Sequence, residues 1–292
     1  MKNKTKINTN TAVLLLPWLI TFAVFWLYPL IYAAYLSMTQ YQTLTDTATY
    51  TGFANYAKMI SDDLFWKALG NTAFFTLGTV PATTALALFF ATLINRKYTR
   101  FKEFFRASYF MPSVTSLVVI ALIFTNLYAK DGYIITICEM LGLPYPERGF
   151  LQEPGTALLS IMAMDVWMAT GYYMILFLAG MQTISRDLYD SAKLAGANAW
   201  QEFWRITLPM LSPTLLFVIV INSIKSFQVF IEIFVMTKGG PMDSTMTLVY
   251  MVFVNAFEKS DMMGYAAAVA YVVFIILLIF SFIQIKLLKP KT

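Results

Sequence analysis

Long apolar runs alternate with short polar segments along the whole chain. A transmembrane helix needs about 20 consecutive, mostly apolar residues. Six runs meet this requirement, at residues 12–36, 68–95, 107–129, 156–181, 212–236 and 262–285. The fifth is the weakest by hydropathy, because it contains Lys225 and Glu232. The pattern predicts an all-α, polytopic integral membrane protein with six transmembrane helices.

The first run also invites interpretation as a signal peptide, because Lys2, Lys4 and Lys6 precede it. The apolar core of a signal peptide is about 7–15 residues long. The run at 12–36 is much longer, so we interpret it as an uncleaved first transmembrane helix.

Basic residues concentrate on one side of the predicted spans. The segments 1–11, 95–107, 183–211 and 286–292 together hold 14 Lys and Arg residues, and the loops 37–67, 129–155 and 237–262 hold six. Cytoplasmic loops are enriched in Lys and Arg. Both termini are therefore predicted to be cytoplasmic, in a cell membrane.

Composition narrows the possible functions. Hydrophobic residues make up 59% of the chain and charged residues 13%, whereas soluble domains carry about 25% charged residues. The net charge of +5 comes from basic residues between the apolar runs, which suits lipid headgroups better than nucleic acid. Histidine is absent and Cys138 is the only cysteine, which disfavours His-based catalysis and excludes a Cys-based metal cluster.

The loop at 183–211 carries signals for two short helices. Ser185 can cap the first, and Gly196 stands where a helix end is expected. Asn198 and Gln201 match a capping box for the second helix, and Pro209 is predicted to end it before the fifth span. On these signals alone the loop is either a docking element or a folded connector without a partner.

The same loop resembles the signature of ABC importer permeases, which reads Glu-Ala-Ala, then Gly, then Ile-x-Leu-Pro. Here the triplet is Asp190-Ser191-Ala192, the glycine is Gly196 and the end is Ile206-Thr207-Leu208-Pro209. Asp for Glu and Ser for Ala are departures that keep the charge and the small size. The resemblance implies a helix that docks into a groove on an ATPase. It assigns this coupling role to Asp190, Ser191, Ala192, Gly196, Leu208 and Pro209.

A second resemblance narrows the class of permease. Gly239-Gly240-Pro241, Ala256-Phe257 and the stretch Gly264 to Ala268 are similar to maltose-type and glycerol-phosphate-type permeases. The Gly-Gly-Pro sequence predicts a turn at the membrane exit, and the small residues of 264–268 predict close helix packing. The permease domain is expected over residues 70–285, after an N-terminal segment 1–69 and before a tail at 286–292.

The resemblance implies the type I importer permease fold, with transport of a sugar or polyol by alternating access. It implies a second permease subunit, two ATP-binding subunits and an extracytoplasmic solute-binding protein as partners. No Gly-x4-Gly-Lys-Ser/Thr motif is present in the chain. ATP and Mg²⁺ are therefore expected on the partner ATPase subunits, and no cofactor is expected on this chain.

Polar residues follow one stripe of the fifth run. Asn222, Lys225, Gln228 and Glu232 are spaced by three, three and four residues, which puts them on one helix face. Such a stripe suits sugar hydroxyls. Lys225 and Glu232 are about two turns apart, so each needs another partner. Contact with a second permease subunit, or snorkelling of Lys225, is the alternative.

The fourth run adds aromatic residues beside a charge. Asp165 and Tyr172 share a helix face, and Trp167 lies on a neighbouring one. Aromatic rings can stack on sugar rings, although they also anchor helices at membrane interfaces. In the third run, Pro112, Ser113 and Ser116 predict a kink.

Two other classes of function remain as hypotheses. An ion-driven secondary transporter would not need the capped loop at 183–211. A membrane enzyme would need a catalytic constellation, and the sequence offers neither histidine nor an evident carboxylate pair.

Overall fold

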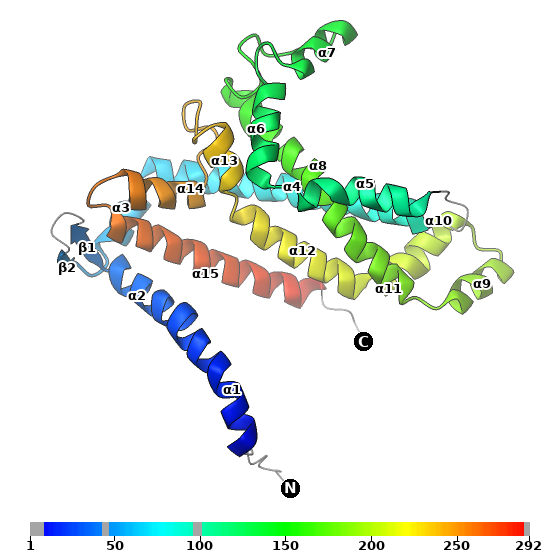
Figure 1. Cartoon of the computed structure of the whole chain (residues 1–292), viewed down its shortest axis with the longest axis horizontal. Helices are drawn as coiled ribbons and strands as arrows, with labels where there is room; N and C mark the ends of the chain where they lie inside the picture. Colours follow the sequence, from blue (N-terminus) through cyan, green and yellow to red (C-terminus); the bar gives the residue numbers. More distant parts are fainter. Residues whose placement is uncertain (1–8, 43–46, 96–100, 289–292) are drawn as a thin grey trace. The chain divides into compact units, whose positions relative to one another are not determined.

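The computed structural model describes residues 9–42, 47–95 and 101–288, with side chains from residue 14 onward. Lys2, Lys4, Lys6 and the end of the tail at 289–292 lie outside the described residues. The chain divides into two compact units, which we describe separately (Figure 1). Unit 1 comprises Met1–Asp62 and Val252–Val273, and unit 2 comprises Asp63–Met251 and Phe274–Thr292.

Unit 1 contains the first membrane span, Leu14–Ser37. It is built from α1 (Thr9–Phe22), a π turn (Ala23–Leu27) and α2 (Tyr28–Ser37). The π turn ends two residues before Pro29, whose ring has no N–H to donate. In a π turn, hydrogen bonds reach one residue further along the chain than in an α-helix. The helical run therefore continues through the proline.

A small hairpin follows the first span. β1 (Thr39–Gln42) pairs antiparallel with β2 (Thr47–Tyr50), and α3 (Ala54–Ile60) comes next. The Asn55 side-chain amide donates to the carbonyl oxygens of Ser37 and Thr39, at 3.0 and 2.9 Å. Gly264 lies against the same Thr39 carbonyl, where a Cβ atom would overlap it. Gly264 permits this contact because it has no Cβ, whereas close helix packing by the whole stretch Gly264 to Ala268 stays a prediction.

Unit 2 contains most of the spans. Its helices up to the loop at 183–211 are α4 (Asp63–Asn95), α5 (Lys102–Val114), α6 (Leu117–Leu127), α7 (Tyr133–Leu141) and α8 (Pro154–Gln182). The loop contains α9 (Arg186–Leu194), α10 (Ala199–Glu202), a π turn (Phe203–Thr207) and α11 (Leu208–Met210). The later helices are α12 (Ser212–Phe227), α13 (Ile231–Met236), α14 (Leu248–Phe253) and α15 (Met263–Leu288), the last two of which cross the unit boundary.

Small residues bring the central helices of unit 2 together. At Gly78 of α4 a Cβ would overlap the Met162 side chain of α8, and at Gly171 of α8 it would overlap the Tyr109 carbonyl oxygen of α5. Between helices in lipid, close van der Waals packing replaces the hydrophobic effect as the source of attraction. These contacts therefore fix how α4, α5 and α8 pack.

The third span is sharply bent. α5 and α6 meet at an angle of 93°, with Thr115 extended between them and Pro112 in the last turn of α5. This confirms the kink predicted from Pro112 and Ser116. Five helices of the described residues are long and apolar enough to cross a membrane, and the bent pair makes six. The six-span prediction is confirmed on that basis.

The fifth span is broken, which corrects the prediction of a single continuous polar stripe. α12 ends at Phe227 and α13 begins at Ile231. The Val229 carbonyl, freed by the break, accepts a hydrogen bond from the Thr247 hydroxyl at 3.2 Å. Broken helices are tolerated at membrane depth where the protein itself satisfies the backbone. Helical spacing could not reveal a partner that lies 18 residues further along the chain.

The contact at Gly171 can be tested by adding one methyl group. Gly171→Ala should destabilise the protein by about 1–3 kcal/mol, the usual cost of overpacking, because the Cβ would displace the Tyr109 backbone. Gly155→Ala in the first turn of α8 is the control, since a Cβ there meets nothing within 4 Å. Unfolding titrations of both variants in mixed micelles would measure this. Equal stabilities would contradict the packing argument.

Candidate functional site

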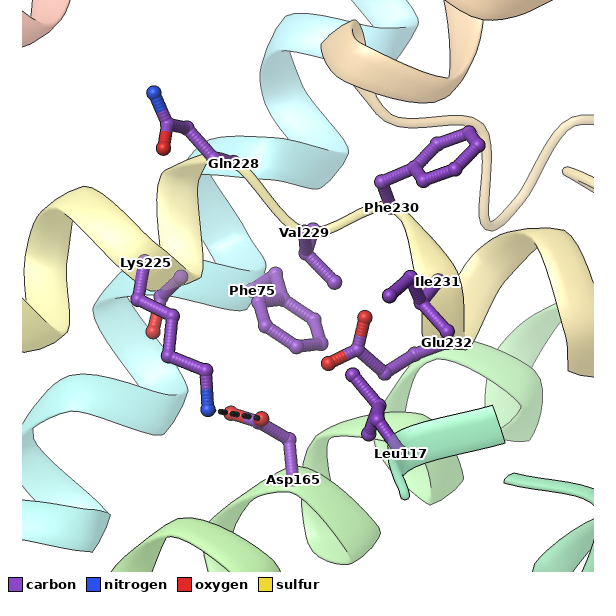
Figure 2. A pocket seen from close by; sticks show the side chains of 10 residues that line it. Phe75, Leu117, Asp165, Lys225, Gln228, Val229, Phe230, Ile231 and Glu232 are labelled. Carbon is purple, nitrogen blue, oxygen red and sulfur yellow. Dashed lines mark ion pairs between the residues drawn. The ribbon is translucent and has the colours of Figure 1, made fainter. Parts of the chain in front are cut away.

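A pocket of ≈ 210 Å³ lies at the break in the fifth span (Figure 2). Side chains from α4, α6, α8, α12 and α13 and from the break itself surround it. They are Phe75, Leu117, Asp165, Lys225, Ser226, Gln228, Val229, Phe230, Ile231 and Glu232. Five helices thus contribute to one membrane-embedded cavity.

The pocket contains three ionisable side chains. Lys225 Nζ lies 3.9 Å from Asp165 Oδ1, with the Asp165 side chain 5% and the Lys225 side chain 46% exposed. Glu232 is 4% exposed. Lys225 therefore finds a partner other than Glu232, as the spacing of the fifth span requires. Charges at membrane depth are costly and usually face a protein interior or a water-filled path.

Apolar walls complete the pocket. Figure 2 shows the Glu232 carboxylate pointing inward between Phe75 and Leu117, whereas the Gln228 amide points away from the group. A few polar groups set in an apolar cavity are typical of small-molecule sites, where the polar groups fix orientation. The arrangement can hold a polar ligand that also has an apolar face.

The predicted pathway residues divide into two sets. Asp165, Lys225, Gln228 and Glu232 line the pocket, whereas Asn222, Trp167 and Tyr172 do not.

Asn222 is buried on α12, where its Oδ1 lies 3.5 Å from Ser226 Oγ. The Trp167 ring packs against the Phe124 ring, with centroids 5.4 Å apart. The Tyr172 backbone N–H donates to Ser113 Oγ at 3.1 Å. A ligand role for Trp167 and Tyr172 therefore stays a prediction that the pocket geometry does not support.

Sequence reasoning missed the apolar lining and one polar stripe. Phe75 and Leu117 come from the second and third spans, and nothing in their local sequence marks them as site residues. In contrast, α4 carries threonines at 72, 76, 79 and 83, all at most 3% exposed. Their spacing of four, three and four is a helical-face signal that the sequence does contain.

The loop at 183–211 folds as its caps predict. Ser185 Oγ accepts from the Asp187 N–H at 3.3 Å at the start of α9. At its end, Gly196 has φ +81° and donates to the Lys193 carbonyl, and Ala197 donates to the Ala192 carbonyl, each at 2.9 Å. This is a Schellman motif, which requires a left-handed residue at Gly196.

The second helix of the loop begins with the predicted capping box. The Asn198 side chain accepts from the Gln201 N–H at 2.9 Å, and the Gln201 side chain accepts from the Asn198 N–H at 3.0 Å. Tyr189 Oη lies 3.0 Å from Thr207 Oγ1, which connects α9 to the returning helix. The loop is therefore a folded helical pair.

The prediction that Pro209 ends this helix before the fifth span is wrong. Helical structure continues through Pro209 to Met210, and α12 begins at Ser212 after a single residue. The preceding π turn explains this, because the Leu208 N–H reaches back to the Phe203 carbonyl. The altered hydrogen-bond ladder accommodates the missing proline donor, as it does before Pro29 in the first span.

The loop encloses a hollow of ≈ 350 Å³. Its lining consists of Ala192, Ala195, Gly196, Ala197, Gln201, Arg205 and Ile206. Around it, Leu194 and Trp200 are 92% and 70% exposed. Of the predicted coupling residues, Ala192 and Gly196 line the hollow, whereas Asp190 and Ser191 are exposed on α9. Leu208 and Pro209 lie beyond it, in α11.

Comparison with known proteins identifies relatives over nearly the whole chain. Residues 83–292 match the family described as "Binding-protein-dependent transport system inner membrane component". The chain is 32% identical to the lactose transport system permease protein LacF of Rhizobium radiobacter, over 95% of this chain and 93% of that protein. It is 34% identical to the multiple sugar-binding transport system permease protein MsmF of Streptococcus mutans, over 93% and 92% of the two chains.

A solved structure shares the fold. One chain of a bacterial ABC transporter involved in the import of the acidic polysaccharide alginate superposes with a TM-score of 0.82, over 96% of this chain and 95% of that chain. Sequence identity is 23%. The architecture is therefore that of an ABC transporter permease.

The buried ion pair can be tested by a double-mutant cycle. Lys225→Met should cost about 1–3 kcal/mol, less than the ~3–5 kcal/mol of a fully buried pair, because 46% of the Lys225 side chain is exposed. Adding Asp165→Asn should recover most of this loss, since residue 165 then carries no buried charge that needs Lys225 as its partner. Unfolding titrations of the three variants would measure the coupling energy.

The exposed pair Lys193–Asp190, at 4.0 Å with side chains 61% and 71% exposed, is the control. Lys193→Met and Asp190→Asn should change stability by less than about 0.5 kcal/mol. A coupling energy no larger at Lys225–Asp165 than at this surface pair would contradict the pairing.

Proposed function

The chain belongs to the family of binding-protein-dependent transport system inner membrane components, and we propose that it forms half of the translocation path for a saccharide or related polyol. It is a permease subunit of an ATP-driven importer and not an enzyme. One observation carries the proposal for the site, namely the pocket around Asp165, Lys225 and Glu232 at the break in the fifth span.

The chemistry of the pocket suits a saccharide. Sugar hydroxyls need donors and acceptors, which Lys225 and Glu232 offer, and the apolar faces of sugar rings suit Phe75 and Leu117 on either side of the Glu232 carboxylate. Relatives named for transport of lactose, of multiple sugars and of arabinooligosaccharides support this class of substrate. In this proposal the pocket binds and releases the substrate without covalent chemistry.

The proposed assembly contains two permease subunits, two ATP-binding subunits and an extracytoplasmic solute-binding protein. ATP and Mg²⁺ bind to the ATPase subunits. The hollow at Ala192, Gly196 and Arg205, with Leu194 and Trp200 exposed beside it, supports docking of an ATPase at this loop. Exposed large apolar side chains at such a place are typical of interaction surfaces.

Alternating access then follows from the path of the chain. ATP binding closes the ATPase pair and moves the docked α9. The contact of Tyr189 with Thr207 carries the movement to the helical run Ala199–Met210, which leads into α12 with only Leu211 between. α12 ends at the pocket. The loop is thus connected to the substrate site by an almost continuous helix.

The chain is proposed to lie in the inner membrane of the cell. Both termini and the loop at 183–211 are on the cytoplasmic side. The excess of Lys and Arg in the segments on that side supports the orientation. The hairpin of unit 1 and the turn at Gly239-Gly240-Pro241 then face outward. Lys67 of α4 donates from its Nζ to the carbonyl of Met242, next to this turn, at 2.5 Å. This hydrogen bond holds the turn against the start of α4.

The coupling role is tested at Gly196. Gly196→Asp should abolish copurification of coexpressed ATPase subunits, because it adds a side chain and a charge at the hollow and strains a left-handed backbone by about 1–2 kcal/mol. Gln182→Ala, an exposed position at the end of α8, is the control. An importer whose Gly196→Asp variant keeps its ATPase subunits would contradict docking at this loop.

The pocket is tested by uptake of labelled lactose and labelled arabinotriose. Glu232→Ala should lower uptake roughly tenfold, since a hydrogen bond to a charged group is worth ~1.5–3 kcal/mol. Gln228→Ala should lower uptake less, because the Gln228 amide points away from the inward-facing carboxylate. Ile221→Val, at an exposed apolar position one turn before Lys225, should leave uptake unchanged.

Normal uptake and selectivity in both pocket variants would contradict the pathway assignment. Uptake that continues without ATPase subunits and responds to an ion gradient would instead favour the ion-driven secondary transporter.

A further inference from the structure

Four threonines form a buried stripe along α4. Thr72, Thr76 and Thr79 each donate their hydroxyl to the carbonyl four residues earlier, at 2.7, 2.9 and 2.8 Å. Thr83, the next on the same face, is fully buried, yet its Oγ1 has no hydrogen-bond partner among the described residues. The hydroxyls of the first three threonines therefore have hydrogen-bond partners, whereas the hydroxyl of Thr83 at the end of the stripe has none among the described residues.

α12 packs against α4 and runs in the opposite direction (Figure 1). Ile94 at the end of α4 and Leu211 just before α12 belong to one apolar cluster. The C-terminal end of α4 therefore lies beside the N-terminal end of α12. That end of both helices is the one that carries the coupling loop.

The antiparallel arrangement places two unsatisfied groups at the same level. Thr79 Oγ1 lies 3.2 Å from Ser226 Oγ, and Ser226 also lines the pocket. One turn further from the pocket on each helix come Thr83 and Asn222. Asn222 is 1% exposed, and its Nδ2 lacks a partner in the described part of the chain.

α15 contributes a third such group. Gln284 Nε2 donates to Ser223 Oγ at 2.8 Å, next to Asn222 in the chain. Gln284 Oε1 is buried without a partner within the described residues. Within the described residues, one donor on α12 (Asn222 Nδ2) and two possible acceptors, on α4 (Thr83 Oγ1) and α15 (Gln284 Oε1), thus lack hydrogen-bond partners.

Burial of an unpaired polar group costs free energy, so native proteins keep few of them. In a protein that alternates between conformations, such groups can be satisfied in the other state. We call the group of buried polar side chains formed by Thr79, Thr83, Asn222, Ser223, Ser226 and Gln284 the polar seam. It starts at the pocket and extends toward the coupling-loop end of the spans.

We propose that the polar seam is the segment of the translocation path between the pocket and the coupling-loop end, closed in this structure. When it opens, Thr83 Oγ1, Asn222 Nδ2 and Gln284 Oε1 bind water and the hydroxyls of the passing saccharide. The inference rests on the proposed function and adds Thr83, Ser223 and Gln284 to the path.

The experiment measures solvent access to the seam in the assembled importer, with its second permease and ATPase subunits. Cys138 is the only cysteine of the chain, so Cys138→Ser gives a cysteine-free background. Thr83→Cys tests the seam. Ala87→Cys, one turn further on α4, equally buried and packed in the apolar cluster with Phe177, is the matched control. The probe is a small hydrophilic methanethiosulfonate reagent.

Without nucleotide, the Thr83→Cys variant should react about tenfold faster than with ATP and vanadate, as expected where the reactive conformation becomes a minor state. The Ala87→Cys variant should react slowly in both conditions. Slow reaction at both positions in every state would overturn the proposal, because the seam would then be permanent polar packing. Equally fast reaction of Thr83→Cys in both states would also overturn it, since the seam would be an always-hydrated cavity.

A second variant separates transport from packing. Thr83→Val keeps the shape but removes the hydroxyl, and it should leave the amount of assembled complex unchanged while lowering uptake of labelled lactose or arabinotriose roughly tenfold, the effect of one lost hydrogen bond. Unchanged uptake would contradict the seam. Loss of the ATPase subunits from the Cys138→Ser parent would instead contradict the proposed function. A complex that hydrolyses ATP, but whose Thr83→Cys variant reacts at the same rate with and without nucleotide, contradicts the seam alone.

Discussion

Inside a lipid bilayer every backbone N–H and C=O must find its partner within the protein. The regular parts of the spans meet this requirement by helix formation. The irregular parts meet it in specific ways, each with a named side chain or turn. Thr247 satisfies the Val229 carbonyl at the break in the fifth span, and Ser113 Oγ connects the bent third span to α8 by donating to the Met168 carbonyl at 2.7 Å. Val229 at the break and Leu117 just after the bend both line the pocket, so the irregular parts of the backbone help to form it.

The charged groups follow the same logic at the level of side chains. Asp165 alone would be a buried charge without compensation, and Lys225 provides it from a neighbouring helix. This pairing holds α12 against α8 just before the break, while Glu232 lies after it on α13. The break therefore puts Lys225 and Glu232, which helical spacing had placed on one face, on two separate helices. A continuous helix would have presented them all in one row.

Sequence patterns predicted the features that depend on neighbours in the chain. The six spans follow from hydropathy, the kink from Pro112, and both caps and the Gly196 turn from the residues at 185–201. The break at 228–230 could not be predicted, because its stabilising contact comes from Thr247. The helix through Pro209 was missed for a different reason, because the π turn before it has no recognised residue signature.

The π turns at Ala23–Leu27 and Phe203–Thr207 give the fold a further property. Each holds one more residue per turn than an α-helix, so each is equivalent to a one-residue insertion. One residue of an α-helix corresponds to a rotation of about 100° around the helix axis. Loss of a single residue between 203 and 207 would therefore turn the face of α10 with Gln201 away from its present direction relative to α12. The length of this turn therefore sets the rotational phase between α10 and α12. An insertion or deletion in the turn would change that phase, whereas a substitution that keeps its length would preserve it.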